Sequence, residues 1–154
     1  MTTIAVRNAV MAVDRCVTNE RLRYQTDQKL HVVDGWAFAI TGDIAPGLAF
    51  VDWIRKGKPA DMPCQLTEDC EVVAMNIKTG VFGSWEKPGV FIESQDAFEA
   101  WGSGARLAIG AMAFGATAEE AVKIAAAWDD STGFGVITAV ADQIPKRKRR
   151  KKHG

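Results

Sequence analysis

The chain contains 154 residues, of which 47% are hydrophobic and 25% are charged, and its formal net charge is zero. This length suits one domain with a substantial core and is too short for two domains of ordinary size. The sequence has no apolar run near the roughly 18–20 residues that a membrane-spanning helix needs, so no membrane association is expected.

Strands are predicted through most of the first forty residues. Apolar residues alternate in the first strand and run continuously in the fourth, as expected for a strand covered on both faces. Asp14 ends the second strand, and Asp34-Gly35 forms a hairpin turn before the fourth. The predicted strands are Thr3–Arg7, Val10–Val13, Lys29–Val33 and Trp36–Ile40.

After Thr41-Gly42-Asp43 the apolar spacing changes to three and four residues, which predicts a helix that ends at Gly57. The apolar residues of this helix are Ile44, Leu48, Val51 and Ile54. A polar loop over Lys58–Asp69 follows it. The next predicted strands are Glu71–Ile77, Val81–Trp85 and Gly89–Ile92.

Two helices and a strand are predicted in the last third of the chain. Small residues over Ala105–Phe114 favour the first helix. Thr117 and Glu120 have the spacing of a capping box, so a second helix is expected from there to Trp128. The last predicted strand is Gly135–Val140.

This order of strands, helix, strands, two helices and strand lacks an alternating βαβα rhythm. Mixed antiparallel sheets with helices layered on them are therefore expected, which is an α+β fold. One domain is expected over residues 1–144, followed by a basic tail over residues 145–154.

The tail holds seven consecutive basic residues, Lys146–Lys152. Without them, 12 basic residues remain against 19 acidic ones, so the rest of the chain has a net charge near −7. Like charges repel and cannot bury apolar surface, so the tail is expected to be disordered. It is either a solvated end or an electrostatic contact for nucleic acid or an acidic protein surface.

Several kinds of site are not expected. The cysteines Cys16, Cys64 and Cys70 are odd in number and form no C-x-x-C pair, which indicates neither a disulfide framework nor a zinc ribbon. No P-loop occurs, and Gly102-Ser103-Gly104 lacks the third glycine of a dinucleotide fingerprint. Neither a cofactor nor a metal is therefore expected. Because the N-terminus lacks a signal-peptide pattern, a cytoplasmic location is expected.

The start of the chain offers a nucleophile. Removal of Met1, which is usual before a small residue, would leave Thr2 with a free α-amino group beside its hydroxyl. Such an amine has a pKa of about 7.7–8.0 and can act as a base near neutral pH. A threonine paired with its own amine is a self-contained nucleophile and base. The alternative is a strand start with an incidental threonine, since threonine favours strands.

Motifs in a fixed order support a family resemblance. The chain opens with Met-Thr-Thr-Ile and a strand, Asp14 closes the second strand, and Lys29 begins a strand that leads to Thr41-Gly42-Asp43. The later motifs are Trp101–Gly104 with its small-residue helix, the Thr117–Trp128 helix, and Asp129-x-x-Thr132-Gly133. Over about residues 2–140 this order resembles that of proteasome β-type subunits, nearest to the bacterial HslV-type peptidase.

The resemblance implies a four-layer αββα sandwich of the N-terminal nucleophile hydrolase type, and a threonine-type peptidase. Thr2 would be the nucleophile and its free amine the base. Lys29 would lower the pKa of that amine, and Asp14 would pair with Lys29. Gly42 would donate its N–H to the oxyanion of the tetrahedral intermediate. The polar network around the amine would comprise Ser103, Asp129 and Thr132.

Alternatives to these roles stay open. Asp14 could be a turn residue, Lys29 an exposed edge charge, Gly42 a helix-start glycine, and Asp129 or Thr132 part of a helical C-terminal turn. The family also implies a homo-oligomeric ring, peptide or unfolded-protein substrates and a separate ATPase unfoldase. The competing functions are an inactive structural or binding subunit of a larger assembly, and an amidase that acts on a small molecule.

Overall fold

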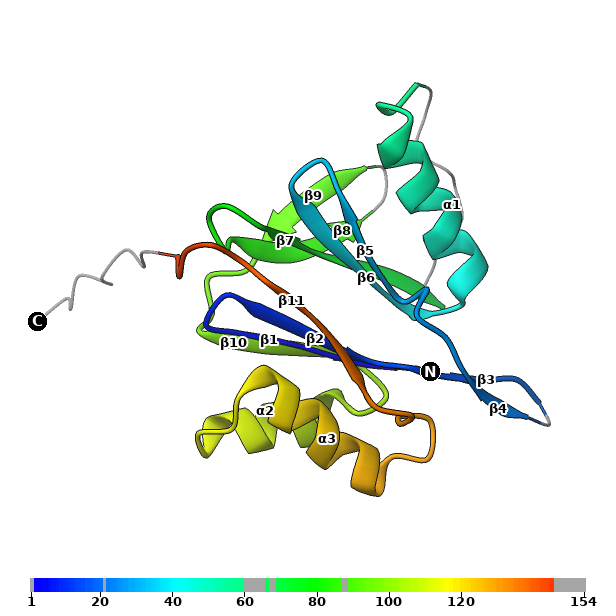
Figure 1. The fold of residues 1–154 in the computed structure, drawn as a ribbon, viewed down its shortest axis with the longest axis vertical. Helices are drawn as coiled ribbons and strands as arrows, with labels where there is room; N and C mark the ends of the chain where they lie inside the picture. The colour runs from blue at the N-terminus through cyan, green and yellow to red at the C-terminus, as the bar shows by residue number, and fades with distance from the viewer. Residues whose placement is uncertain (1, 21, 60–65, 67–68, 87–88, 146–154) are drawn as a thin grey trace, which may run out of the picture.

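The computed structural model describes residues 2–20, 22–59, 66, 69–86 and 89–145. Met1, Cys64 and the expected basic tail from Lys146 onward lie outside these residues. The described part is an α+β chain in which two antiparallel sheets face each other and helices cover their outer sides (Figure 1).

The first sheet has four strands in the order β10-β1-β2-β11. These strands are β1 (Thr3–Arg7), β2 (Val10–Asp14), β10 (Phe98–Gly102) and β11 (Val136–Val140). Because β1 pairs with both β10 and β2, the first strand of the chain lies in the interior of the sheet. Its first residue, Thr3, is paired with Gly102.

The second sheet has five strands in the order β5-β6-β7-β8-β9. These strands are β5 (Leu30–Val33), β6 (Trp36–Gly42), β7 (Cys70–Asn76), β8 (Phe82–Glu86) and β9 (Val90–Glu93). A separate hairpin pairs β3 (Cys16–Thr18) with β4 (Arg23–Gln25). This hairpin extends from the body of the molecule on the side of the N-terminus (Figure 1).

The helices cover the two outer faces of the paired sheets. Helix α1 (Ile44–Arg55) packs on the five-stranded sheet, whereas α2 (Ala105–Ala113) and α3 (Ala118–Trp128) pack on the four-stranded sheet (Figure 1). The expected cap of α3 is present, since Thr117 Oγ1 accepts a hydrogen bond from the Glu120 amide at 3.1 Å. Among the described residues, no helix is both long and apolar enough to span a bilayer.

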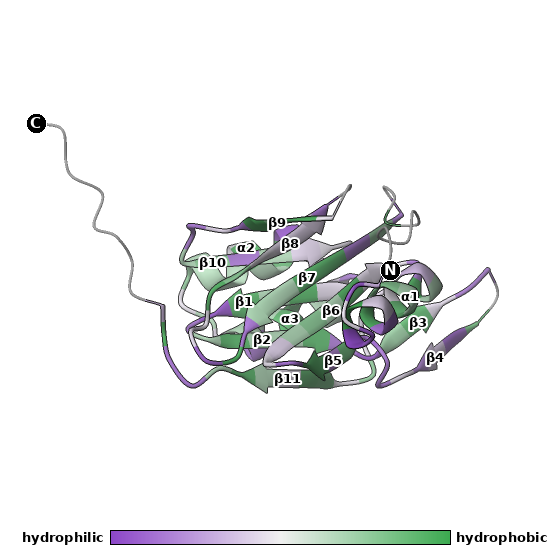
Figure 2. Ribbon diagram, turned by 90° about the horizontal axis from the view of Figure 1, so that it is seen from above, coloured by the Kyte–Doolittle hydropathy of each residue, from purple (hydrophilic) through white to green (hydrophobic). Residues whose placement is uncertain are grey.

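The side-chain pattern of the strands explains this layering, because successive residues of a strand face opposite sides of the sheet. In β1, Ile4 and Val6 pack between the sheets, whereas Ala5 packs toward α2 and α3. In β6, Ala39 packs between the sheets and Phe38 packs toward α1. The middle residues of these two strands are therefore apolar on both faces, and Figure 2 shows green segments along the strands of both sheets.

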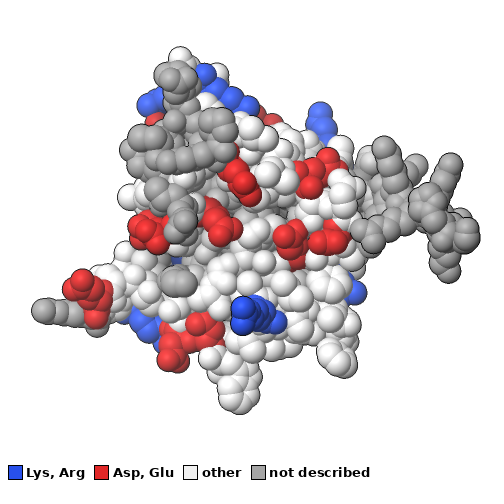
Figure 3. Space-filling view, turned by 180° about the vertical axis from the view of Figure 1, so that it is seen from behind, with Lys and Arg blue, Asp and Glu red and all other residues white. Residues whose placement is uncertain are grey.

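Acidic side chains stand out on one side of the molecule. Figure 3 shows them in several groups across the middle of the face that is hidden in Figure 1.

The predicted elements agree with the observed ones in order and type, and their bounds agree within a few residues. Three strands were not predicted, namely β3, β4 and β10. β3 and β4 have three residues each, too few for a periodic signal. β10 ends in Gly102 and pairs with β1, a partner far away in the sequence, so its short stretch carried no clear strand pattern.

Candidate active site

Asp14 is buried at the end of β2 and accepts four hydrogen bonds. Its Oδ1 accepts from the Thr3 amide at 3.0 Å and from Lys29 Nζ at 3.2 Å. Its Oδ2 accepts from the amides of Cys16 at 3.1 Å and Gly133 at 3.0 Å. A buried charge is costly unless it is paired and hydrogen-bonded, and these four donors meet that need. Asp14 is thus a fixed anion that joins β1, β3, Lys29 and the loop after α3.

Lys29 lies in the turn directly before β5 and is the largest side chain that is fully buried. It is not an exposed edge charge, because only 1% of the residue is accessible. Burial lowers the pKa of Lys29, although the charge and the hydrogen bond of Asp14 act in the opposite direction. The Lys29 carbonyl also accepts from the Ile40 amide at 2.9 Å, which ties its backbone to β6. Lys29 is therefore held both at its backbone and at its ammonium group.

A second group of polar side chains surrounds Asp129, the C-cap residue directly after α3. Its Oδ2 accepts from Ser103 Oγ at 2.5 Å and from Thr132 Oγ1 at 2.6 Å, and its Oδ1 accepts from the Ser131 amide at 3.2 Å. Burial by itself would raise the pKa of Asp129, but the hydrogen bonds from Ser103 and Thr132 outweigh it and hold that pKa below its ordinary value. Asp129 is therefore a stable carboxylate at neutral pH.

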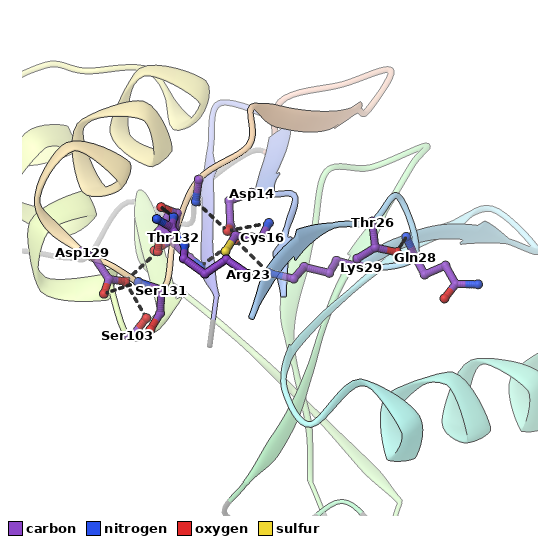
Figure 4. A network of polar contacts seen from close by, with 12 residues as sticks. Asp14, Cys16, Arg23, Thr26, Gln28, Lys29, Ser103, Asp129, Ser131 and Thr132 are labelled. Atoms are coloured by element: carbon purple, nitrogen blue, oxygen red, sulfur yellow. Dashed lines mark hydrogen bonds and ion pairs between the residues drawn. The ribbon is translucent and has the colours of Figure 1, made fainter. Parts of the chain in front are cut away.

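Thr3 connects the two groups. Its hydroxyl lies 2.7 Å from the hydroxyl of Thr132, and its amide donates to Asp14. Figure 4 shows the resulting network, which runs from Ser103 and Asp129 through Thr132 to Asp14 and Lys29. The structure thus brings five of the seven expected site residues into one continuous set of polar contacts beside Thr2.

Thr2 itself immediately precedes β1 and is 1% exposed. Gly102 of β10 lies against it with a φ of +94°, and a Cβ on Gly102 would stand 1.8 Å from the Thr2 carbonyl oxygen. The same Cβ would stand 2.9 Å from Thr41 Oγ1. Only glycine leaves room for this approach and adopts this φ readily. Gly102 therefore allows Thr2 and the end of β6 to lie next to each other.

Gly42 is the last residue of β6 and follows Thr41, so it lies on the side of the site where β6 approaches Thr2. Its φ is +82°, and a Cβ there would stand 1.9 Å from the Asp69 carbonyl oxygen. This close approach gives a structural reason for glycine at the start of α1. The role of its N–H as an oxyanion donor stays a prediction.

Four residues of the network were not expected from the sequence as site residues: Thr3, Cys16, Ser131 and Gly133. Thr3 had one available signal, because it follows Thr2 on a strand whose alternate residues face opposite sides. Cys16 and Gly133 contribute backbone amides to Asp14, and a backbone donor leaves no signature in the residue type. Among the described residues, no group of three or more His, Cys, Asp or Glu side chains is placed to hold a metal ion.

Comparison with known proteins gives a fold. No family model matches the sequence, and no curated protein matches it. BPH of Thiobacillus denitrificans has a similar structure, with a TM-score of 0.71 and 21% identity over 95% of this chain and 100% of its own. The same protein in complex with epoxomicin has a TM-score of 0.68 and 22% identity, over 94% of this chain and 99% of its own. HslV from Trypanosoma brucei has a TM-score of 0.65 and 20% identity, over 92% of this chain and 99% of its own. The chain therefore has an HslV-like fold, which confirms that part of the resemblance.

Proposed function

We propose that the chain is a threonine-type N-terminal nucleophile peptidase that acts through Thr2. One observation carries the proposal: a single oxygen of Asp14 accepts hydrogen bonds from both Lys29 Nζ and the Thr3 amide. The buried cation therefore lies within two hydrogen-bond lengths of the residue that follows Thr2. A cation at this place lowers the pKa of a nearby amine and favours the form that accepts a proton.

The proposed reaction begins once the Thr2 amine is free, which requires removal of whatever precedes it. That amine takes the hydroxyl proton of Thr2 while Oγ1 attacks the carbonyl carbon of the scissile peptide bond. The Gly42 N–H stabilises the oxyanion that forms. The intermediate collapses to an ester on Thr2 as the amine proton passes to the leaving nitrogen. The amine then takes a proton from water as the water oxygen attacks the ester. It returns this proton to Oγ1 of Thr2 as the acid is released.

The other site residues have supporting roles in this proposal. Lys29 sets the pKa of the amine, and Asp14 holds Lys29 in place. The Ser103, Asp129 and Thr132 network orients the amine, and its negative charge stabilises the amine while it carries the transferred proton within each half-reaction. The arrangement of two facing sheets between helices supports a further proposal, that the fold is the four-layer αββα sandwich of the N-terminal nucleophile hydrolases.

Assembly is part of the proposal. Large apolar side chains are exposed on the outer helices, and the most exposed are Phe114 at 97% and Trp128 at 79%. Exposed apolar patches mark surfaces that bind other proteins. We therefore propose a cytoplasmic homo-oligomeric ring that acts on peptides or unfolded proteins with a separate ATPase unfoldase. Light scattering tests the oligomer, and a stable monomer at micromolar concentration would count against it.

The experiment uses protein whose N-terminus has been shown by intact mass to be Thr2. We expect hydrolysis of fluorogenic peptides that is lost in Thr2→Ala and partly kept in Thr2→Ser, because serine retains a hydroxyl beside the amine. Thr138→Ala is the matched control, since Thr138 is an exposed threonine on β11. Epoxomicin, which is bound by the Thiobacillus protein, should add to wild type and not to Thr2→Ala.

Full turnover by Thr2→Ala would exclude Thr2 as the nucleophile. Cleavage of small amides without cleavage of peptides would favour the amidase alternative. A correctly processed protein that hydrolyses neither and leaves epoxomicin unbound would favour a structural subunit.

A further inference from the structure

Arg23 is an exposed residue of the β3–β4 hairpin that has no role in the reaction described above. Its side chain crosses from β4 to the loop after α3, where Nη2 donates to the Thr132 carbonyl at 3.4 Å. Its guanidinium also lies over the ring of Phe134, 5.4 Å from the centroid. A Cβ on Gly133 would stand 3.0 Å from the same Nη2. Arg23 thus contacts three consecutive residues of one loop.

The guanidinium also reaches the residue that anchors Asp14. A side-chain hydrogen bond with Cys16 is the largest of the effects that raise the pKa of Arg23. Asp130 and Asp129 raise this pKa further by their charges. Figure 4 shows Arg23 and Cys16 beside Thr132 and Asp14. One side chain therefore joins the hairpin, the Asp14 anchor and the loop that carries Thr132.

The loop that Arg23 contacts has an unusual backbone. Phe134 has a φ of +59°, in the left-handed region that bulky residues rarely adopt. Such a conformation persists only where the surroundings hold it, and it is common at functional sites. The stacked guanidinium and the Thr132 contact are restraints of this kind. They act on the segment whose Thr132 hydroxyl lies 2.7 Å from Thr3 and 2.6 Å from Asp129.

The hairpin needs such a contact as well. An isolated two-stranded hairpin is at best marginally stable in water, so its position depends on what it touches. Arg23 is on β4, and all three residues of this strand are exposed. The Arg15 amide already bonds the base of the hairpin to the carbonyls of Gly133 and Gly135. The contact of Arg23 with Thr132 and Phe134 adds a side-chain link from β4 to the same loop.

We propose that Arg23 is a positioning residue that holds the Thr132–Phe134 loop against the β3–β4 hairpin and so keeps the Thr132 hydroxyl between Thr3 and Asp129. This inference rests on the proposed function for its kinetic consequence. Its structural part, the restraint of the loop, does not depend on activity. An arginine is needed because its planar fork can donate to separate acceptors while it stacks on a ring, which a lysine ammonium cannot do.

The test compares Arg23→Met and Arg23→Lys with wild type, each with Thr2 at the terminus. Arg55→Met is the control, because Arg55 is an exposed arginine on α1 that pairs with Asp52 at 3.9 Å. We expect kcat for a fluorogenic peptide to fall by about tenfold to 10²-fold in Arg23→Met, in the range of a misplacement near 1 Å, with KM little changed. Arg23→Lys should be impaired too, and Arg55→Met should match wild type.

Hydrogen exchange supplies a readout that is independent of activity. The amides of Thr132 and Gly133 donate to the Asp129 carbonyl and to Asp14, so both should be protected in wild type. Both amides should exchange faster in Arg23→Met than in wild type, and their exchange rates should be unchanged in Arg55→Met. If wild type hydrolyses no peptide, the proposed function fails, and the exchange rates still decide whether Arg23 restrains the loop.

Two results would overturn the inference. If Arg23→Met has the same exchange rates and the same kcat as Arg55→Met, Arg23 does not restrain the loop. Full activity of Arg23→Lys beside an impaired Arg23→Met would assign the effect to charge and would contradict a role in positioning.

Discussion

Lys29 and Asp14 form an ion pair in which Nζ lies 3.2 Å from Oδ1 and neither side chain is more than 2% exposed. Asp14 also accepts three backbone amides, so removal of its charge affects four donors at once. The pair is therefore a structural element of the fold as well as the centre of the candidate site.

Loss of one partner of this pair should be costly. Breaking a buried ion pair leaves an uncompensated charge and typically costs about 3–5 kcal/mol, so we expect Asp14→Asn to destabilise the protein by about that amount. Asp27→Asn makes the same chemical change at an exposed carboxylate, which pairs with the half-buried Arg15 at 2.8 Å, and should cost less than about 1 kcal/mol. Urea unfolding measures both. Equal losses of unfolding free energy in the two variants would show that the buried pair contributes no more to stability than the Arg15–Asp27 pair.

The buried lysine predicts a pH dependence of stability. Burial lowers the pKa of Lys29 in the folded protein, whereas in the unfolded chain it returns to about 10.4. Between these two values the unfolded chain binds more protons at this group, so the contribution of Lys29 to stability rises with pH. Below the folded pKa the group is charged in both states and the contribution is constant.

The measurement is the difference in unfolding free energy between wild type and Lys29→Met, followed from neutral pH to about pH 10.4. The difference should change in favour of wild type as the pH rises through this range. A difference that stays flat, or that changes in favour of Lys29→Met, would contradict a lowered pKa.

Gly102 offers a test of the contact beside Thr2. Gly102→Ala should destabilise the protein and disturb Thr2, because the new Cβ would stand 1.8 Å from the Thr2 carbonyl oxygen. Gly115→Ala is the matched control, since Gly115 has a similar φ of +103° with no atom within 4 Å of a Cβ. Both variants carry the conformational cost of a positive φ, and only the first adds a clash. Thermal unfolding should therefore separate them, and equal melting temperatures would argue against the clash.

Deletion of residues 146–154 should leave the melting temperature nearly unchanged, because every proposed site residue and every observed strand precedes them. Binding to polyanions or an acidic protein should weaken in the deletion. In the full chain this binding should fall steeply with salt, since exposed charges are screened within about 8 Å at physiological ionic strength. If nucleic acid is the partner, the logarithm of affinity should fall linearly with the logarithm of salt concentration. A deletion that unfolds the protein would contradict a dispensable tail.

The sequence predicted the elements whose signal is local. The alternation in Thr3–Arg7 and the spacing of Ile44, Leu48, Val51 and Ile54 each correspond to an observed strand or helix. The Thr117 cap was also predictable, because the capping box is a pattern of residues three apart. β10 was not, since its strand character comes from pairing with β1.

The candidate site was predictable only in part and for a similar reason. The residue types at Asp14, Lys29 and Asp129 were identified through their order along the chain, and the structure places them in one network. The backbone amides that Asp14 accepts could not be predicted from residue types. Nor could the hydroxyl contact between Thr3 and Thr132, which lie far apart in the sequence. The sequence does not predict the contacts of Arg23, because they depend on the shape of the Thr132–Phe134 loop.

The contact between Thr3 and Thr132 has a consequence for the order of events during synthesis. β1 is made before its neighbour β10 and well before the loop that holds Thr132. A nascent or truncated chain that stops before Thr132 can therefore contain the threonine at its start without the network around it. The polar network beside the proposed nucleophile can therefore form only after synthesis has passed Thr132.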